Sequence, residues 1–220
     1  MFALVESGSI TKFLNGNKFI TLNDLQYPRA IYTLWTEAER NAIGIYTVEY
    51  DNSNKKDEKW YINTNQSYAF ADNKVTATYG TATARAHADV NEVWTQEEID
   101  EGKAPDGTSD GDAKNDEDGN QIVTRGLKYY LIRDVKAQAA DELAKTDWYV
   151  VRKSEESTAI PSAITPNRRL VRSRQASMET SITNASDTPA LETLYTYVNT
   201  ADEGDPIVMA RPLAVIPTLD

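Results

Sequence analysis

Residues 127–161 read LKYYLIRDVKAQAADELAKTDWYVVRKSEESTAIP, and this stretch decides how the second half of the chain is interpreted. In its first part, apolar residues recur at spacings of three and four, which is the period of one face of an α-helix. The residues that set this period are Tyr129, Ile132, Val135 or Lys136, Ala139 and Leu143. We therefore predict an amphipathic helix that ends at Thr146-Asp147.

The segment DWYVVRK, residues 147–153, is predicted to be an extended connection that follows this helix. It reads as a strap that packs the first helix against a second. We therefore expect Trp148 to be largely buried, and Trp148→Ala to cost about 3–5 kcal/mol of stability. No residue in the segment has a partner base, a metal-ligand spacing or a nucleophile context. The segment is interpreted as a packing seam.

Two further helices are predicted in residues 125–200. They follow Thr165-Pro166 and Thr188-Pro189, each of which suits an N-cap followed by proline at the first helical position. The apolar stripe of the second helix is Val171, Met178, Ile182 and Ala185, and that of the third is Leu191, Leu194, Tyr195 and Val198. The sequence therefore predicts a compact C-terminal module of three helices.

Residues 1–94 are predicted to form a β-rich module with short helices. Its apolar and polar residues alternate with a period of two, and Asn15-Gly16 suits a tight hairpin turn. Capping boxes predict helix starts at Thr36, with Glu39 three residues on, and at Thr95, with Glu98. Glycines suited to helix ends follow them, at Gly44 and Gly102. Together with the C-terminal helices, this pattern predicts the α+β class.

Residues 95–124 combine a short helix with an acidic segment that has almost no apolar side chain to bury. They carry 10 acidic and 2 basic side chains, so most of the chain's net charge of −11 lies in this segment. We predict a long flexible loop and place the domain boundary here. The tail, residues 201–220, is predicted to be extended because prolines punctuate its apolar run. Such a tail is suited either to lie extended on a neighbouring subunit or to pack back on its own domain.

Composition excludes several classes of site. The chain of 220 residues has no cysteine and one histidine, His87, which rules out thiolate zinc sites, disulfides and two-histidine metal triads. His87 has no Ser-Gly elbow nearby, so we interpret it as an exposed loop or strand histidine. No phosphate loop or dinucleotide fingerprint is present, and we expect neither a signal peptide nor a membrane span. We expect no cofactor and no enzymatic activity.

A calcium loop is a weak alternative for part of the acidic segment. Asp106, Asp110 and Glu117 fall at positions 1, 5 and 12 of the calcium-binding pattern, with Gly111 at position 6. However, position 3 offers only a hydroxyl and position 9 is a lysine, so a solvated loop is the default expectation.

A basic cluster lies on the second predicted helix, at Arg168, Arg169, Arg172 and Arg174. It lacks the aromatic stacking partners and wider positive charge that nucleic acid binding requires. A salt-bridged surface or contact with an acidic neighbour fits better. The candidate partner contacts are Arg168, Arg169, Arg172, Pro206, Ile207, Val208 and Leu213.

Two stretches of the sequence carry a family resemblance. The first is FITLNDLQYPRAIYTLWTEAERNAIGIYTVEYDN, and its characteristic residues are Leu22, Asn23, Tyr27, Pro28, Glu39, Arg40, Ile43, Gly44 and Ile45. It resembles a segment of proteins associated with the tails and tail fibres of tailed bacteriophages. The second, KAQAADELAKTDWYVVRKSEESTAIPSAITPNRRLVRS, is similar to a helical C-terminal domain of unknown function in the same phage proteins. There the match is carried by Leu143, Thr146, Asp147, Trp148, Arg152, Ile160, Pro161, Arg169 and Arg172.

This resemblance implies a non-enzymatic virion structural protein of the tail, at the baseplate, a fibre attachment or an adaptor. It would be made in the host cytoplasm and assembled with other phage tail proteins as a homo-oligomer, without nucleic acid or membrane. A tail-fibre assembly chaperone is the alternative. A host-surface hydrolase is disfavoured, because no paired carboxylates stand in a catalytic context. The long acidic insertion and the apolar tail depart from the pattern and leave the exact role open.

Overall fold

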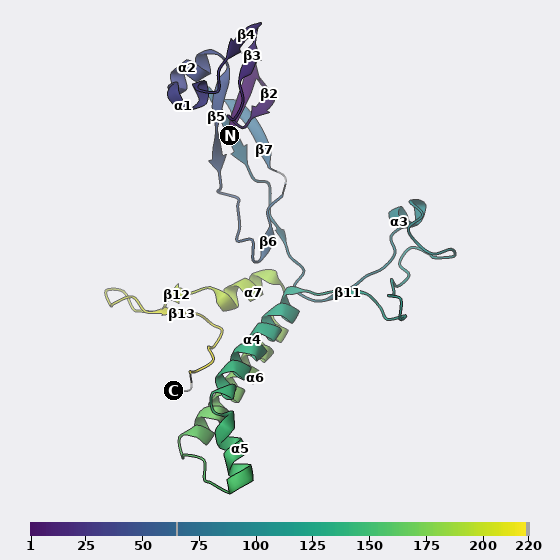
Figure 1. Ribbon diagram of the computed structural model, residues 1–220, viewed down its shortest axis with the longest axis vertical. Helices are drawn as coiled ribbons and strands as arrows, with labels where there is room; N and C mark the ends of the chain where they lie inside the picture. Colours follow the sequence, from purple (N-terminus) through teal and green to yellow (C-terminus); the bar gives the residue numbers. More distant parts are fainter. Residues whose placement is uncertain (65, 219–220) are drawn as a thin grey trace. The chain divides into compact units, whose positions relative to one another are not determined.

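The computed structural model describes residues 1–64 and 66–218, and the chain divides into two compact units, Met1–Thr83 and Ala84–Asp220. The first unit is built mostly of strands and the second contains the long helices (Figure 1). Strands and helices are both abundant, which confirms the α+β class. The division lies upstream of the predicted boundary in residues 95–124. The acidic segment instead belongs to the second unit, where β10 (Val90–Asn91) pairs with β11 (Val123–Thr124) at its base.

A five-stranded sheet with the order β2-β1-β5-β8-β7 forms the centre of the first unit. Its strands are β1 (Phe2–Glu6), β2 (Ser9–Leu14), β5 (Ile45–Asp51), β7 (Ser67–Ala71) and β8 (Lys74–Thr78). β5 and β8 run parallel, and the other neighbours are antiparallel. The edge strands approach each other, and the rings of Phe13 and Tyr68 lie 4.4 Å apart. The sheet is therefore curled around its inner face.

Both faces of this sheet are buried against apolar side chains. One face is formed by Ala3, Val5, Val48, Val75 and Ala77. The other is covered by β3 (Ile20–Leu22), β4 (Leu25–Tyr27), α1 (Ile31–Leu34) and α2 (Glu37–Ala42). Leu4 and Ile45 pack there against Ile20, Ile31 and Tyr32. The alternation of β1 thus divides Ala3 and Val5 from Leu4, as a half-turn per residue requires.

The predicted hairpin at Asn15-Gly16 is wrong. β2 pairs with β1 across Ser7-Gly8, and β3 pairs with β4 across Asn23-Asp24. Both residues of the second turn have positive φ, 48° and 63°, which Asn and Asp tolerate better than other side chains. At Gly16, an added Cβ would lie 3.1 Å from the Phe2 ring. That glycine therefore permits a close approach outside any hairpin.

Both predicted capping boxes are confirmed. At the start of α2, the Glu39 carboxylate accepts from the Thr36 N–H at 2.7 Å, and the Thr36 hydroxyl accepts from the Glu39 N–H at 3.3 Å. Thr95 and Glu98 repeat this at α3 (Gln96–Asp100). Gly44 follows α2 with φ +81°, and its carbonyl accepts from the Val5 N–H at 2.8 Å.

The second unit contains α4 (Leu127–Ala144), α5 (Asp147–Glu156), α6 (Ile164–Asn184) and α7 (Thr188–Tyr195). α4 and α6 lie side by side, as Figure 1 shows, and bury Ala139 and Val171 between them. The stripe residues Val135, Ala139, Val171, Met178, Ile182, Ala185 and Leu191 are buried as predicted. No helix within the described residues is long and apolar enough to cross a membrane.

The helical predictions need three corrections. Residues 147–156 form a helix, so the three-helix prediction is wrong and the module has a further helix, α5. Tyr129 is 43% exposed, and Val198 belongs to β12 (Val198–Asn199), which pairs with β13 (Met209–Ala210). The N-caps predicted at Thr165 and Thr188 are wrong: α6 begins at Ile164 without a side-chain cap, and the cap of α7 is Asp187, whose carboxylate accepts from the Ala190 N–H. The remaining short strands are β6 (Tyr61–Ile62) and β9 (Thr83–Ala84).

Candidate interaction surfaces

A buried arginine, Arg168 of α6, joins the end of α4 to the start of α5. Its guanidinium donates to the Leu143 carbonyl, the Thr146 hydroxyl and the Asp147 carboxylate, each at 2.7 Å. The Arg168 side chain is 9% exposed, whereas that of Asp147 is 58% exposed. Arg168 was predicted as a partner contact, and that prediction is wrong because this side chain satisfies groups of its own unit.

The same junction explains the roles of Thr146 and Asp147. Thr146 is buried, and its hydroxyl donates to the Leu143 carbonyl while it accepts from Arg168. Asp147 occupies the first turn of α5, where a carboxylate is favourable to the helix dipole. Thr146 and Asp147 therefore fix the corner at which the chain leaves α4 and begins α5.

Helix α5 has no buried residue. Trp148 and Val151 are each 51% exposed, so the predicted burial of Trp148 is wrong, and with it the large cost of Trp148→Ala. The Trp148 ring stacks on Tyr149, with centroids 3.9 Å apart, and Arg152 lies over the Trp148 ring at 4.6 Å. The face of α5 that carries Trp148 and Val151, here called the α5 face, is therefore open to solvent.

The other predicted contacts fall into two groups. Arg169 and Arg172 are exposed on α6, and Arg172 borders a hollow with Gln175 and Glu179. Pro206, Ile207 and Val208 are exposed next to the β12–β13 pair, with Ile207 75% exposed. These positions remain open to a partner.

Leu213 does not remain open. It is 1% exposed, and its N–H donates to the Leu194 carbonyl of α7 at 2.9 Å. Ile216 packs nearby against Ala139 and Val171. The tail thus folds back on its own unit at these residues, which was one of the two alternatives that the sequence left open. The prediction of Leu213 as a partner contact is wrong.

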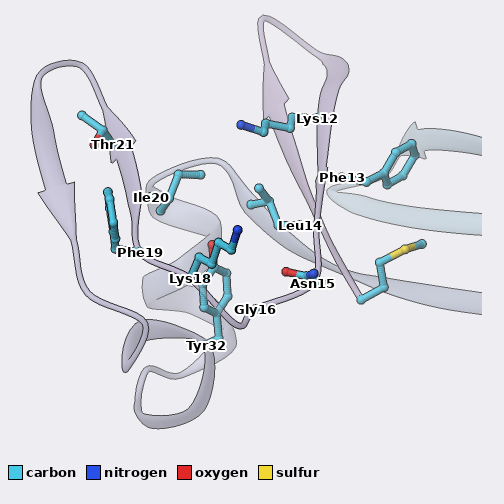
Figure 2. A pocket seen from close by; sticks show the side chains of 11 residues that line it. Lys12, Phe13, Leu14, Asn15, Gly16, Lys18, Phe19, Ile20, Thr21 and Tyr32 are labelled. Atoms are coloured by element: carbon cyan, nitrogen blue, oxygen red, sulfur yellow. The ribbon is translucent and has the colours of Figure 1, made fainter.

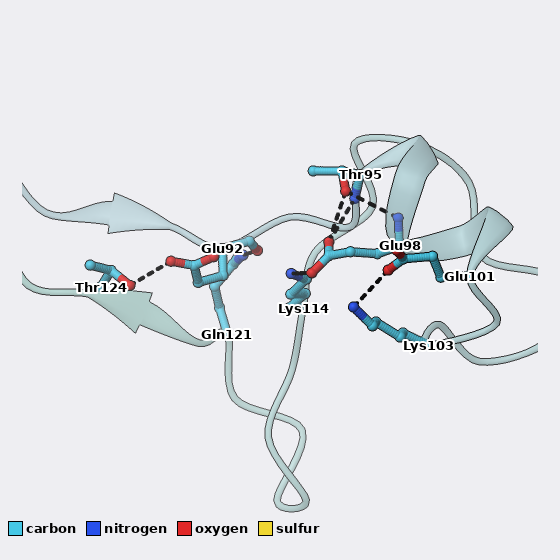
Figure 3. A network of polar contacts seen from close by, with 8 residues as sticks. All are labelled: Glu92, Thr95, Glu98, Glu101, Lys103, Lys114, Gln121 and Thr124. Carbon is cyan, nitrogen blue, oxygen red and sulfur yellow. Dashed lines mark hydrogen bonds and ion pairs between the residues drawn. The ribbon is translucent and has the colours of Figure 1, made fainter. Parts of the chain in front are cut away.

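The acidic segment is a hydrogen-bonded arm, which differs from the flexible loop predicted for it. The Lys114 N–H donates to the Glu92 carbonyl and the Trp94 N–H to the Asp112 carbonyl, at 2.9 and 2.8 Å. Glu98 connects separate segments of this arm, as Figure 3 shows. Its carboxylate accepts from the Lys114 ammonium at 2.6 Å and from the N–H and hydroxyl of Thr95. Backbone pairing replaces the apolar core that this segment lacks.

Within this arm, the Lys114 ammonium and the Thr95 N–H lower the pKa of the Glu98 carboxyl to about 2. Because the pKa is depressed in the folded arm, the network stabilises it fully above pH 4.5 and is lost as the pH falls toward 2. We expect Lys114→Gln to raise the pKa of Glu98, measured by NMR titration of its carboxyl carbon. Lys103→Gln, which removes only the ion pair with Glu101, is the control. A Glu98 pKa that stays near 2 without Lys114 would contradict this assignment.

The structure does not assemble the calcium candidates Asp106, Asp110 and Glu117. Among the described residues, no group of three histidine or acidic side chains is arranged to hold a metal ion. Lys114, at position 9 of the calcium pattern, is engaged by Glu98. Another acidic residue of the arm, Asp116, accepts from the N–H groups of Asn120 and Asp118, and these bonds lower the pKa of its carboxyl.

Around His87, backbone contacts join the start of α4 to the chain that precedes the arm. The His87 carbonyl accepts from the Lys128 N–H, and the Ala86 carbonyl from the Leu127 N–H, both at 2.9 Å. The Asp89 carboxylate accepts from the Gly126 N–H and pairs with Arg125, and both contacts lower its pKa. His87 was predicted to be exposed, but it is half-buried.

The α5 face was missed because residues 147–153 were interpreted as extended. The signal was present: Trp148, Val151 and Glu155 are spaced by three and four, and no glycine or proline interrupts residues 147–156.

Comparisons of the chain with protein-family models, with curated proteins and with solved structures gave no match.

Proposed function

We propose that the chain is a non-enzymatic structural component of a bacteriophage tail, at the baseplate, a fibre attachment or an adaptor, and that it works by protein–protein assembly. The resemblance of two stretches to phage tail proteins supports the proposed location in a tail. The α5 face supports assembly, and it is the observation that carries the proposal.

Large apolar side chains on a helix with no buried residue are typical of a surface that a partner covers. Trp148 combines a large area with few rotatable bonds, which makes tryptophan a frequent anchor of interfaces. The Arg168 contacts fix the start of this helix through Thr146 and Asp147. Since the anchor is already held in place, little ordering entropy opposes binding.

The proposed occupant of the α5 face is a second copy of the chain. Arg152 and Glu155 lie on the same side of α5 as Trp148, given 3.6 residues per helical turn. A two-fold antiparallel pairing would bring Arg152 of one copy toward Glu155 of the other while Val151 is covered. Such self-complementarity is what a symmetric dimer requires.

Val151→Asp should therefore weaken self-association of the full chain at least tenfold, measured by size-exclusion chromatography with light scattering over a concentration series. A buried aspartate without a partner is costly, whereas at an exposed position it is tolerated. Val150→Asp is the matched control, because Val150 is also exposed but points away from Trp148 on the same helix. Both variants should melt like the wild type. A wild-type chain that stays monomeric, or an equal loss of self-association in the two variants, would contradict the proposal that the α5 face mediates assembly.

A further inference from the structure

The first unit carries two adjoining hollows that are lined by cations. One, of about 550 Å³, lies between β2 and the chain that leads into β3, and Lys12, Leu14, Lys18, Phe19 and Tyr32 are among its lining residues (Figure 2). The other, of about 540 Å³, is lined by Lys18, Phe19 and Arg29, among others. Lys18 and Phe19 line both hollows, so the two adjoin at these residues, and together they are here called the basic groove.

The positive charge of the basic groove is not neutralised within the unit. Among the residues that the structure describes, no carboxylate lines either hollow. Nor does Lys12, Lys18 or Arg29 form a side-chain hydrogen bond or ion pair with any described residue. Three cations around a concave surface raise the local potential and favour an anionic occupant.

Apolar side chains border the same groove. Phe19 is 61% exposed, and Figure 2 shows Leu14 and Ile20 between Lys12 and Lys18. Tyr32 is largely buried, and this burial raises the pKa of its phenol, so that it adds no negative charge. An occupant that fits both features needs carboxylates together with an apolar side chain.

From this combination we infer that the basic groove binds an extended acidic segment of a partner protein, with an apolar side chain against Phe19 and carboxylates at Lys12, Lys18 and Arg29. An extended segment fits because the two hollows adjoin at Lys18 and Phe19, and their volumes of about 550 and 540 Å³ lie in the range of ligand-binding pockets. Nucleic acid fits less well, because residues 1–83 carry 8 basic and 9 acidic side chains and offer no wide basic surface.

This inference rests on the proposed assembly function for the class of partner, a protein. The test is a selection of random 12-residue peptides, displayed on phage, for binding to the full chain. Selected peptides should be enriched in Asp and Glu beside an aromatic or aliphatic residue. Their affinity, measured by fluorescence anisotropy, should fall as salt rises, since exposed charge pairs are screened.

Lys12→Glu/Lys18→Glu should weaken binding of the selected peptides at least tenfold. Lys55→Glu/Lys74→Glu is the matched control: it makes the same change in net charge at two lysines whose own ion pairs are exposed. The control should bind within twofold of the wild type. Thermal melting checks that both double variants fold.

Peptides without acidic enrichment, or acidic peptides that bind both double variants equally, would overturn the inference. Tighter binding of an oligothymidine than of any selected peptide would overturn it in favour of nucleic acid. Tighter binding of a peptide of residues 106–118 would assign the groove to the acidic arm of a second copy instead. None of these results depends on whether α5 mediates self-association, so failure here is distinguishable from failure of the proposed function.

Discussion

Arg168→Met should lower the free energy of unfolding of the second unit by about 2–4 kcal/mol. Met keeps much of the buried side-chain volume, but it removes hydrogen bonds to the Leu143 carbonyl, the Thr146 hydroxyl and the Asp147 carboxylate. Hydrogen bonds to a charged group contribute about 1.5–3 kcal/mol each. The hydrogen bond that remains between the Thr146 hydroxyl and the Leu143 carbonyl offsets part of this loss. Asp147 contributes little to this sum because its carboxylate is exposed to water.

Urea denaturation followed by circular dichroism measures this change, and hydrogen exchange locates it. We expect the amides of α5 and of the last turn of α4 to exchange faster, because Arg168 joins these segments. Arg172→Met is the control, since Arg172 is exposed on the same helix. Equal stability of the two variants would show that Arg168 does not hold the junction.

Gly126→Ala should destabilise the second unit by about 3 kcal/mol, the upper part of the range for overpacking. A Cβ at Gly126 would lie 2.2 Å from the Ala88 carbonyl oxygen, which is a backbone atom and not the flexible end of a side chain. Relief of this clash requires residues 86–89 to move away from the start of α4. That movement breaks the hydrogen bonds from Leu127 to Ala86 and from Lys128 to His87.

The control for this prediction is Gly107→Ala in the acidic arm. Gly107 has φ +84° and nothing near its Cβ position, so only backbone strain of about 1–2 kcal/mol is expected. Thermal and urea unfolding of both variants compares the two effects. A Gly126→Ala chain as stable as the wild type would mean that these backbones are not in contact in solution.

Local signals in the sequence predicted the elements whose partners lie close in the chain. The boxes at Thr36 and Thr95 need only a residue three positions away, and both form. Val135, Val171 and Leu191 are buried, and the helical period of the apolar residues was enough to predict this. The hairpin at Asn15-Gly16 failed because the same dipeptide signal serves a close approach to Phe2, a tertiary contact that the local sequence does not reveal.

The candidate site was predicted less well, for a physical reason. Arg168, Arg169 and Arg172 look alike in sequence, but only Arg168 points at the α4–α5 corner. Leu213 and Ile207 both lie in the apolar tail, yet α7 covers one and leaves the other exposed. The basic groove joins Lys12, Lys18 and Arg29 from separate segments, and only the folded unit brings them together.

The most direct test of the proposed tail function is the quantitative peptide mass spectrum of purified particles of a phage that encodes this chain. The proposal predicts peptides of the chain in intact particles, at several copies each, and their enrichment in isolated tails. Particles that contain their tail fibres but lack every peptide of this chain would contradict a structural role. That result would favour an assembly chaperone that leaves before the particle is complete.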